Sequence, residues 1–420
     1  MGSDPLANIA GRARLAALPE TGRRFLAGFS WIALFFAGAR ASSLASQFLA
    51  GRVLGPEEFG RAHLITGMAA TVQILPMLGF PFALSRLGGQ SDRPGATAAA
   101  LSAFFVWAAL CVGILAGGGA ALAPLTGLSA AHWNLCLALS AATALHLTLG
   151  GALQGLTRFK ERGLSEALYG LASFGTLAVW LSIGRPSAGV LLGSTIAGLS
   201  AAALFSLWLL RGQLRATLSA APLREILPFA ALGAFSLMTA ALIQTPGRVV
   251  LFHLDSARAS GIYAAYFMAT VQVALALVNM LQAVLIPLAS RTEGQREAWD
   301  LVRGWWLPAA AALPGVFAVG AGAVIGIMGR SYPKEPLWIL LFALAASAIL
   351  LHSVLAALFA ARDMAGLLTA TGAGLGAGLL NLLLTLSLAP RLGVAGAALG
   401  LAVSHCASAG LLLALMPRRA

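Results

Sequence analysis

Arginine, amide and hydroxyl side chains recur at helical spacing within four long apolar segments of the sequence. In the first segment, Arg40, Ser43 and Gln47 follow one another at i, i+3 and i+7, which puts them on one face of a helix. An arginine in the middle of an apolar span costs roughly 2.5–3.5 kcal/mol on insertion scales, so we expect Arg40 to face a wet cavity. Its forked donors match the oxygens of a phosphate or pyrophosphate. The first segment therefore predicts part of an anion-binding site.

Similar polar stripes occur in the other three segments, and together they predict the walls of one central cleft. The stripes consist of His63, Thr66 and Gln73 in the second segment, Gln244 and Arg248 in the seventh, and Gln272, Asn279 and Gln282 in the eighth. We add Arg52, which follows the first segment, to the predicted substrate-binding residues. The acidic residues fall in tails, connections or span ends, so the cleft should be cationic. Hydrogen bonds between buried helices would explain the same stripes without a substrate, and this alternative stays open.

Other titratable residues indicate weaker sites. His146 and His352 occupy similar places in the fourth and tenth segments and could carry protons, although we expect each to bond to a neighbouring helix. Glu166 is expected at the membrane interface, beside a group of basic residues. No HExxH sequence, paired Cys/His spacing or Walker sequence occurs. We therefore predict a protein that is not an enzyme, with no catalytic residue, metal ion or cofactor.

The elements that position these residues must be membrane helices. The 420 residues are 59% hydrophobic and only 10% charged, whereas a soluble domain carries about 25% charged residues. A helix crosses a bilayer in about 20 residues, and the sequence has room for about twelve such spans. We expect an all-α, polytopic membrane protein with spans at 26–50, 62–84, 97–122, 131–155, 164–183, 187–210, 226–250, 261–288, 305–328, 336–360, 365–388 and 393–416.

The distribution of basic residues predicts how the chain is oriented. With twelve spans, 18 of the 27 Lys and Arg residues lie in the tails and in the connections on the same side as the tails, and 8 lie opposite. Because basic residues are enriched in cytoplasmic connections, both termini should be cytoplasmic. Residues 1–24 read as a basic amphipathic tail on the cytoplasmic surface. The net charge of +13 is spread between the spans and does not indicate a nucleic-acid partner.

The second half of the sequence repeats the first. Gly51-Arg52-Val53 returns as Gly247-Arg248-Val249, and Ala70-Thr71-Val72-Gln73 returns as Ala269-Thr270-Val271-Gln272. Six spans followed by six in the same orientation predict two lobes related by a pseudo-twofold axis along the membrane normal. The predicted lobes are residues 25–211 and 226–416, joined by a cytoplasmic linker at 212–225 and followed by a cytoplasmic tail at 417–420.

Several short motifs, in order along the chain, resemble those of a known family. These are RVLGPEEFG at 52–60, SGIYAA at 260–265, PLASR at 287–291, and Asn381 followed by RLGVAGAA at 391–398. They are similar to motifs of the Wzx-type polysaccharide or O-antigen flippases, in the multidrug/oligosaccharidyl-lipid/polysaccharide exporter superfamily. The motifs touch both halves, so the resemblance covers essentially the whole chain.

The resemblance implies a MATE-like flippase fold and a function in the bacterial inner membrane. Such a flippase moves undecaprenyl-pyrophosphate-linked sugar repeat units from the cytoplasmic to the periplasmic leaflet by alternating access. Arg40 and Arg248 stand where related flippases have arginines in the cavity. The partners implied are the lipid-linked oligosaccharide, membrane lipid, a polysaccharide polymerase and glycosyltransferases. The chain departs from the family at Thr245-Pro246-Gly247-Arg248, where an aspartate is usual.

Three alternatives remain at this stage. A multidrug antiporter of the same superfamily should show a membrane carboxylate for ion coupling, and the first span has an arginine instead. A lipid II flippase generally carries two additional spans. A membrane glycosyl-transfer enzyme should have a large extracytoplasmic loop, and no such loop is visible in the sequence.

The predicted orientation can be tested by cysteine labelling. A cysteine at Ser91 should react with an impermeant maleimide only from the cytoplasmic side, and one at Ser129 only from the periplasmic side, because the two positions flank one span. Labelling of intact cells and of inside-out vesicles gives the two measurements. Reversed labelling would overturn the orientation.

Overall fold

The computed structural model describes residues 20–87, 95–214, 220–289 and 292–416, and this part of the chain is helical apart from short connections. Ten of its helices are long and apolar enough to cross a membrane. The first two predicted spans lie in addition to these, on the two arms of α2 (Glu20–Val72), which bends sharply at Gly55. The protein is thus an all-helical, multi-pass membrane protein. The predicted connection that contains Ser91 and most of the predicted tail 1–24 lie outside the described residues.

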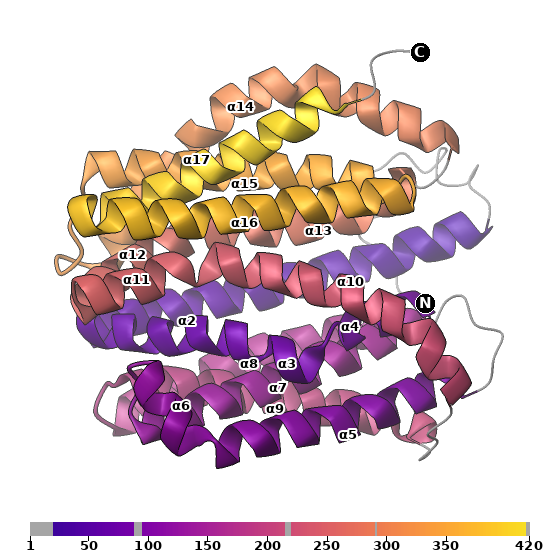
Figure 1. Cartoon of the computed structure of the whole chain (residues 1–420), viewed down its shortest axis with the longest axis horizontal. Helices are drawn as coiled ribbons and strands as arrows, with labels where there is room; N and C mark the ends of the chain where they lie inside the picture. The colour runs from indigo at the N-terminus through magenta and orange to yellow at the C-terminus, as the bar shows by residue number, and fades with distance from the viewer. Residues whose placement is uncertain (1–19, 88–94, 215–219, 290–291, 417–420) are drawn as a thin grey trace, which may run out of the picture.

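The first six spans form one lobe, drawn in indigo to magenta in the lower half of Figure 1. After α2 come α3 (Ile74–Met77), α4 (Phe80–Leu87), α5 (Ala96–Gly117), α6 (Gly119–Leu125), α7 (Ala130–Gly155), α8 (Phe159–Ile183) and α9 (Ala188–Leu209). Helix α8 packs between α2 and α9, and α7 contacts α4 and α9.

The last six spans form the second lobe, drawn in red to yellow (Figure 1). They comprise α10 (Ala220–Gln244), α11 (Pro246–Leu254), α12 (Ala257–Ala269), α13 (Val271–Ala289), α14 (Thr292–Met328), α15 (Pro336–Ala360), α16 (Met364–Leu392) and α17 (Val394–Ala414). Helix α2 begins and α17 ends at the same end of the bundle, as an even number of crossings requires (Figure 1).

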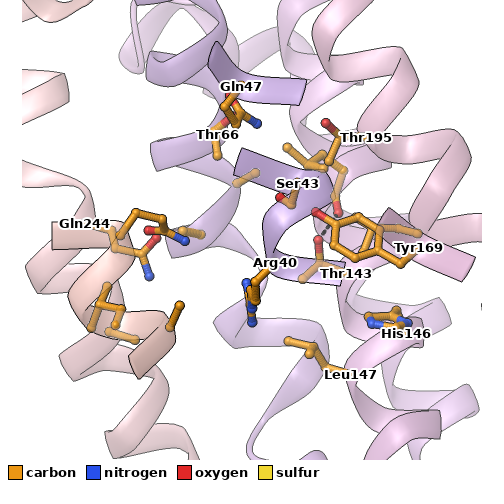
Figure 2. Close-up of a pocket in the computed structure, with 18 of the residues that line it drawn as sticks. Arg40, Ser43, Gln47, Thr66, Thr143, His146, Leu147, Tyr169, Thr195 and Gln244 are labelled. Carbon is orange, nitrogen blue, oxygen red and sulfur yellow. Dashed lines mark hydrogen bonds between the residues drawn. The ribbon is translucent and has the colours of Figure 1, made fainter. Parts of the chain in front are cut away.

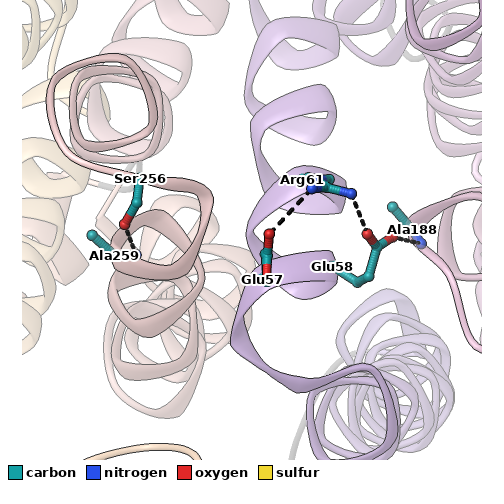
Figure 3. A network of polar contacts seen from close by, with 6 residues as sticks. All are labelled: Glu57, Glu58, Arg61, Ala188, Ser256 and Ala259. Carbon is teal, nitrogen blue, oxygen red and sulfur yellow. Dashed lines mark hydrogen bonds and ion pairs between the residues drawn. The ribbon is translucent and has the colours of Figure 1, made fainter.

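The motif at 52–60 has a structural role at the bend of α2. Gly55 adopts φ 71°, a left-handed conformation that glycine tolerates without strain. In the turn that follows, Glu58 accepts a hydrogen bond of 2.9 Å from the backbone N–H of Ala188 at the start of α9, and Arg61 bridges Glu57 and Glu58 (Figure 3). A carboxylate at a helix N-terminus is favourable because it compensates the helix dipole. The motif therefore ties the bend of α2 to α9.

Three of the helices that face the other lobe are interrupted near their middle. The second span passes from α2 to α3 at Gln73, which keeps helical dihedrals, and breaks before α4 at Leu78 and Gly79, which have positive φ. The seventh span breaks at Thr245, between α10 and α11, and the eighth breaks at Thr270, between α12 and α13. The break at Thr270 falls within the repeated sequence Ala-Thr-Val-Gln, whereas the equivalent Thr71 of the first copy lies inside α2.

Glycines bring the two lobes into backbone contact at two crossings. A Cβ on Gly60 would collide with the carbonyl of Ala257 and lie 2.7 Å from the amide nitrogen of Gly261, so α2 and α12 pack without intervening side chains. The second crossing joins Gly79, between α3 and α4, to α10, where a Cβ on Gly233 would lie 2.8 Å from the Gly79 carbonyl oxygen. Small residues allow such close approach of membrane helices. The arm formed by residues 56–87 therefore contacts the second lobe at both ends.

The backbone contact at Gly60 predicts that alanine there destabilises the protein, although alanine normally stabilises a helix more than glycine does. Gly60→Ala should lower the free energy of unfolding by about 1–3 kcal/mol, since the added methyl group overpacks the contact with α12. Gly376→Ala on α16 is the matched control, because a Cβ there meets nothing within 4 Å. Thermal unfolding of the purified variants in detergent gives the measurement. A Gly60→Ala protein as stable as the Gly376→Ala protein would contradict the backbone contact.

Candidate functional site

A cavity of about 640 Å³ lies between the two lobes. The first lobe contributes lining residues from α2, α7, α8 and α9, and the second contributes residues from α10 to α13. Figure 2 shows polar side chains facing this space from both lobes, with Gln244 opposite Tyr169 and Arg40 between them. The helices that carry the polar stripes in the sequence thus share one cavity.

Nine of the eleven predicted substrate-binding residues line this cavity. They are Arg40, Ser43, Gln47, His63, Gln73, Gln244, Arg248, Gln272 and Asn279. Arg52 is instead exposed near the bend of α2, and Gln282 lies three residues beyond Asn279 on α13, outside the lining. Arg52 and Arg248 are equivalent in the repeat but occupy different surroundings. A substrate-binding role for the nine lining residues stays a prediction.

Arg40 is half-buried on α2 and projects into the cavity (Figure 2). Within the described chain it forms no ion pair. One turn further along α2, Ser43 lies close to Tyr169 of α8 on the same wall of the cavity. The Arg40 guanidinium is therefore available to an anion that enters the cavity.

Arg248 lines the opposite lobe and is held in place by aromatic and small residues. Its side chain is 2% exposed, and its guanidinium carbon lies 4.7 Å from the centre of the Phe267 ring, a cation–π arrangement. Its Nε has no hydrogen-bond partner among the described residues. Its side chain packs beside Gly67 of α2, and Ser260 donates to its backbone carbonyl at 2.9 Å. Arg248 is thus a buried cation with unused hydrogen-bonding capacity.

His63 lies on the same face of α2, one turn before Gly67. It is 3% exposed, and its ring centre lies 4.3 Å from that of Phe59. Neither ring nitrogen has a partner in the described structure. His63 lies close to Arg248, and its ring is a further polar group of the cavity lining.

Glu166, which the sequence placed at the membrane interface, is buried in the wall of the cavity. Helix α8 begins at Phe159, five residues earlier than the predicted span, so Glu166 lies about two turns inside the helix and lines the cavity. Glu166 is 4% exposed and forms an ion pair with Arg162. Its Oε1 also forms a hydrogen bond of 3.1 Å with Nε2 of His146. The described cavity lining thus contains one carboxylate, and the expectation of a cleft without any is also corrected.

The cavity remains cationic despite this carboxylate. Its lining includes three arginines, Arg40, Arg162 and Arg248, against the single acid Glu166. His146 is bonded to a neighbouring helix, as expected, and its counterpart His352 on α15 packs against His405 of α17, with ring centres 5.5 Å apart. An excess of guanidinium groups around the cavity suits the binding of an anion with several oxygens.

Several polar residues of the cavity are not part of the predicted stripes. Tyr169, Thr143 and Thr195 line it from α8, α7 and α9 (Figure 2). Thr143 and Thr195 are isolated polar residues on apolar helices and give no sequence signal. Arg162, Glu166 and Tyr169 stand at i, i+4 and i+7, which places them on one helix face and would have identified α8 as a cavity wall.

Comparisons with known proteins agree with this architecture. One similar structure is an inward-facing multidrug resistance MATE family transporter of the MOP superfamily. The match covers 90% of this chain and 93% of that transporter, with a TM-score of 0.68 and 13% identity. A second match, to a MOP superfamily transporter from Pyrococcus furiosus, covers 92% of this chain and 94% of that one, with a TM-score of 0.65 and 12% identity. The binding pocket of that transporter is described as having reverse polarity, which suggests a different function for it. At such identities the likeness shows the fold alone. No curated protein matches the sequence.

The sequence itself assigns the family. The family model described as polysaccharide biosynthesis protein matches residues 25–293, which include the whole first lobe and the cavity-lining helices of the second. The chain therefore belongs to the polysaccharide biosynthesis protein family and has the MATE fold of the MOP superfamily transporters.

Proposed function

We propose that the protein is a lipid-linked oligosaccharide flippase. Its cargo is an undecaprenyl-pyrophosphate-linked sugar repeat unit, which it moves from the cytoplasmic to the periplasmic leaflet of the bacterial inner membrane by alternating access. One observation carries the proposal: the cavity between the lobes holds three arginines and one carboxylate. The family match to polysaccharide biosynthesis proteins supports the same class of cargo.

The chemistry of the cavity fits the polar end of such a lipid. A pyrophosphate carries several charged oxygens that accept forked hydrogen bonds from guanidinium groups. Arg40 and Arg248 lie on opposite lobes, so a bound pyrophosphate is expected to contact both. Amides and hydroxyls of the lining, such as Gln47 and Gln244, are suitable partners for sugar hydroxyl groups. The polyprenyl chain stays in the surrounding lipid, because moving its apolar surface into water is unfavourable.

The expected orientation and partners follow from this assignment. The termini are cytoplasmic, and cargo enters the cavity from the cytoplasmic leaflet. Glycosyltransferases supply the loaded lipid and a polysaccharide polymerase consumes it on the other side.

A multidrug antiporter of the same superfamily is a second candidate, favoured by two observations. The fold matches that of multidrug resistance MATE transporters, and Glu166 is a buried carboxylate in the cavity, which an antiporter needs for ion coupling. The excess of arginines opposes this function, because many drugs exported by such proteins are cations. Efflux of a cationic dye from vesicles that contain the protein, together with no movement of a pyrophosphate lipid, would favour the antiporter.

The flippase proposal predicts that Arg40 is needed for transport. In proteoliposomes that contain a fluorescent polyprenyl-pyrophosphate-linked sugar, Arg40→Ala should slow flipping about tenfold or more, because a charge-assisted hydrogen bond contributes about 1.5–3 kcal/mol. Arg40→Lys should retain part of the rate, since it keeps the charge but loses the fork. Arg185→Ala, in the exposed connection between α8 and α9, is the matched control and should flip normally. Wild-type flipping by Arg40→Ala would show that the assignment of Arg40 is wrong.

Alternating access predicts that the cavity contains water. A cysteine at Ser43, which lines the cavity, should react with a charged thiol reagent, whereas one at Ser46 on the same helix should not, because Ser46 is 4% exposed. The reaction is measured in inside-out vesicles with the three native cysteines replaced. A pyrophosphate lipid should slow the reaction at position 43. Equal reactivity at the two positions would contradict a wet cavity.

A further inference from the structure

A buried ion pair lies on the cavity wall formed by α8. Arg162 and Glu166 are one turn apart, 8% and 4% exposed, and bonded to each other. The only other carboxylate–arginine pair described on α8, Arg158 with Glu161, joins side chains that are about one-third exposed and lies outside the cavity. A buried pair recovers its desolvation cost only with further hydrogen bonds. The Arg162–Glu166 pair therefore needs an explanation beyond helix stability.

The hydrogen-bonding capacity of Arg162 is only partly used. Its Nη1 is buried and has no partner among the described residues. Gly150 of α7 provides the space for this guanidinium, since a Cβ there would collide with Nη1, and the guanidinium carbon lies 5.7 Å from the centre of the Phe36 ring. The side chain lines the main cavity and also a smaller one of about 270 Å³ next to it. Arg162 is thus a positioned cation on the cavity wall whose hydrogen-bonding capacity is only partly satisfied by Glu166.

Glu166 has two partners, and one of them is sufficient to hold it. Its Oε1 bonds both to Arg162 and to Nε2 of His146, at 3.1 Å, on α7. The charged or titratable groups near it are Arg40 of α2, His146 of α7, and Arg162 and Tyr169 of α8. If an anion takes Arg162, Glu166 keeps its hydrogen bond with His146.

We propose that Arg162 is an additional binding residue for the cargo's pyrophosphate and that Glu166 is its exchangeable counter-ion. This inference rests on the proposed function. In the empty protein Glu166 neutralises Arg162. When cargo enters, a pyrophosphate oxygen replaces Glu166 on Arg162, and the carboxylate remains bonded to His146.

Such an exchange makes the site selective. A weakly charged anion gains too little from Arg162 to displace a carboxylate that is already in place, whereas a pyrophosphate contacts Arg162 and Arg40 at once. Selectivity then arises from competition within the protein as well as from attraction to the ligand. The internal anion also avoids leaving a third uncompensated cation in the empty cavity.

The exchange predicts that removing the counter-ion strengthens binding. Glu166→Gln should bind farnesyl pyrophosphate about tenfold more tightly than wild type, since the ligand no longer displaces a charged competitor. The double variant Arg162→Gln/Glu166→Gln should lose this gain, because the additional cation is gone. Titration calorimetry of the purified full-length protein in a neutral detergent measures the dissociation constants. If Glu166→Gln binds no more tightly than wild type, or if the double variant binds as tightly as Glu166→Gln, the proposal is overturned.

The controls separate this exchange from general effects of charge and from the source of the ligand. Glu161→Gln removes the carboxylate of the exposed pair on the same helix and should leave the affinity unchanged. Farnesol, which lacks phosphate, should show no difference between wild type and Glu166→Gln. Inorganic pyrophosphate should show the same gain as farnesyl pyrophosphate if the phosphate oxygens alone are recognised, and a smaller one if the lipid chain contributes. A gain with farnesol would contradict an exchange at Arg162.

A measurement on the wild-type protein covers the case in which Glu166→Gln does not fold. Dicyclohexylcarbodiimide modifies membrane carboxyl groups that are free of an ion pair, and peptide mass spectrometry quantifies the product at Glu166. Farnesyl pyrophosphate should increase this modification and farnesol should not; an unchanged or lower extent would overturn the exchange. If the wild type flips its lipid and requires Arg40, but none of these effects occurs, this inference fails while the flippase proposal stands.

Discussion

The cost of placing a guanidinium group at bilayer depth governs this structure. Three arginines of the described helices line the cavity, and each is removed from lipid by the packing of the lobes. Arg248 rests on Phe267, Arg162 is paired with Glu166, and Arg40 faces the cavity. The interrupted helices and the glycine crossings make this arrangement possible, because they bring polar backbone and side chains from both lobes to the same enclosed space. Without such a cavity, the same arginines would be exposed to lipid, which is energetically unfavourable.

The fold could be predicted from the sequence because long apolar runs allow few structures other than helices in a bilayer. The stripes in the first, second, seventh and eighth spans also located the main walls of the cavity, because helical periodicity fixes which side chains share a face. The burial of Glu166 in the cavity wall was not predicted, since hydropathy starts the fifth span after Arg162 and does not show that the helix begins earlier, at Phe159. Arg52 was included because it follows the first span, but packing leaves it exposed near the bend of α2, whereas its counterpart in the repeat, Arg248, lines the cavity. Isolated residues such as Thr195 carry no periodic signal at all.

The two lobes share their topology but not their chemistry. His146 and His352 are related by the same spacing as Arg185 and Arg391, and both are buried in the wall of their lobe. His146 meets a carboxylate, whereas His352 meets a second histidine on α17. At the same spacing Glu166 corresponds to Gly372, so the second lobe has no equivalent ion pair at this position. The charged network of the cavity therefore belongs mainly to the first lobe, and the second contributes Arg248 and amides.

The two glycine crossings have a mechanical consequence for the segment between them. Residues 56–87 meet α12 at Gly60 and α10 at Gly79, and the helix is broken at Leu78 and Gly79. A helix that is held at two points and broken near one of them bends at the break when its supports move. We expect a relative displacement of the lobes to change the angle at Leu78, a short distance along the chain from Gln73, whose side chain faces the cavity. The backbone breaks thereby link the shape of the chamber to the positions of its two halves.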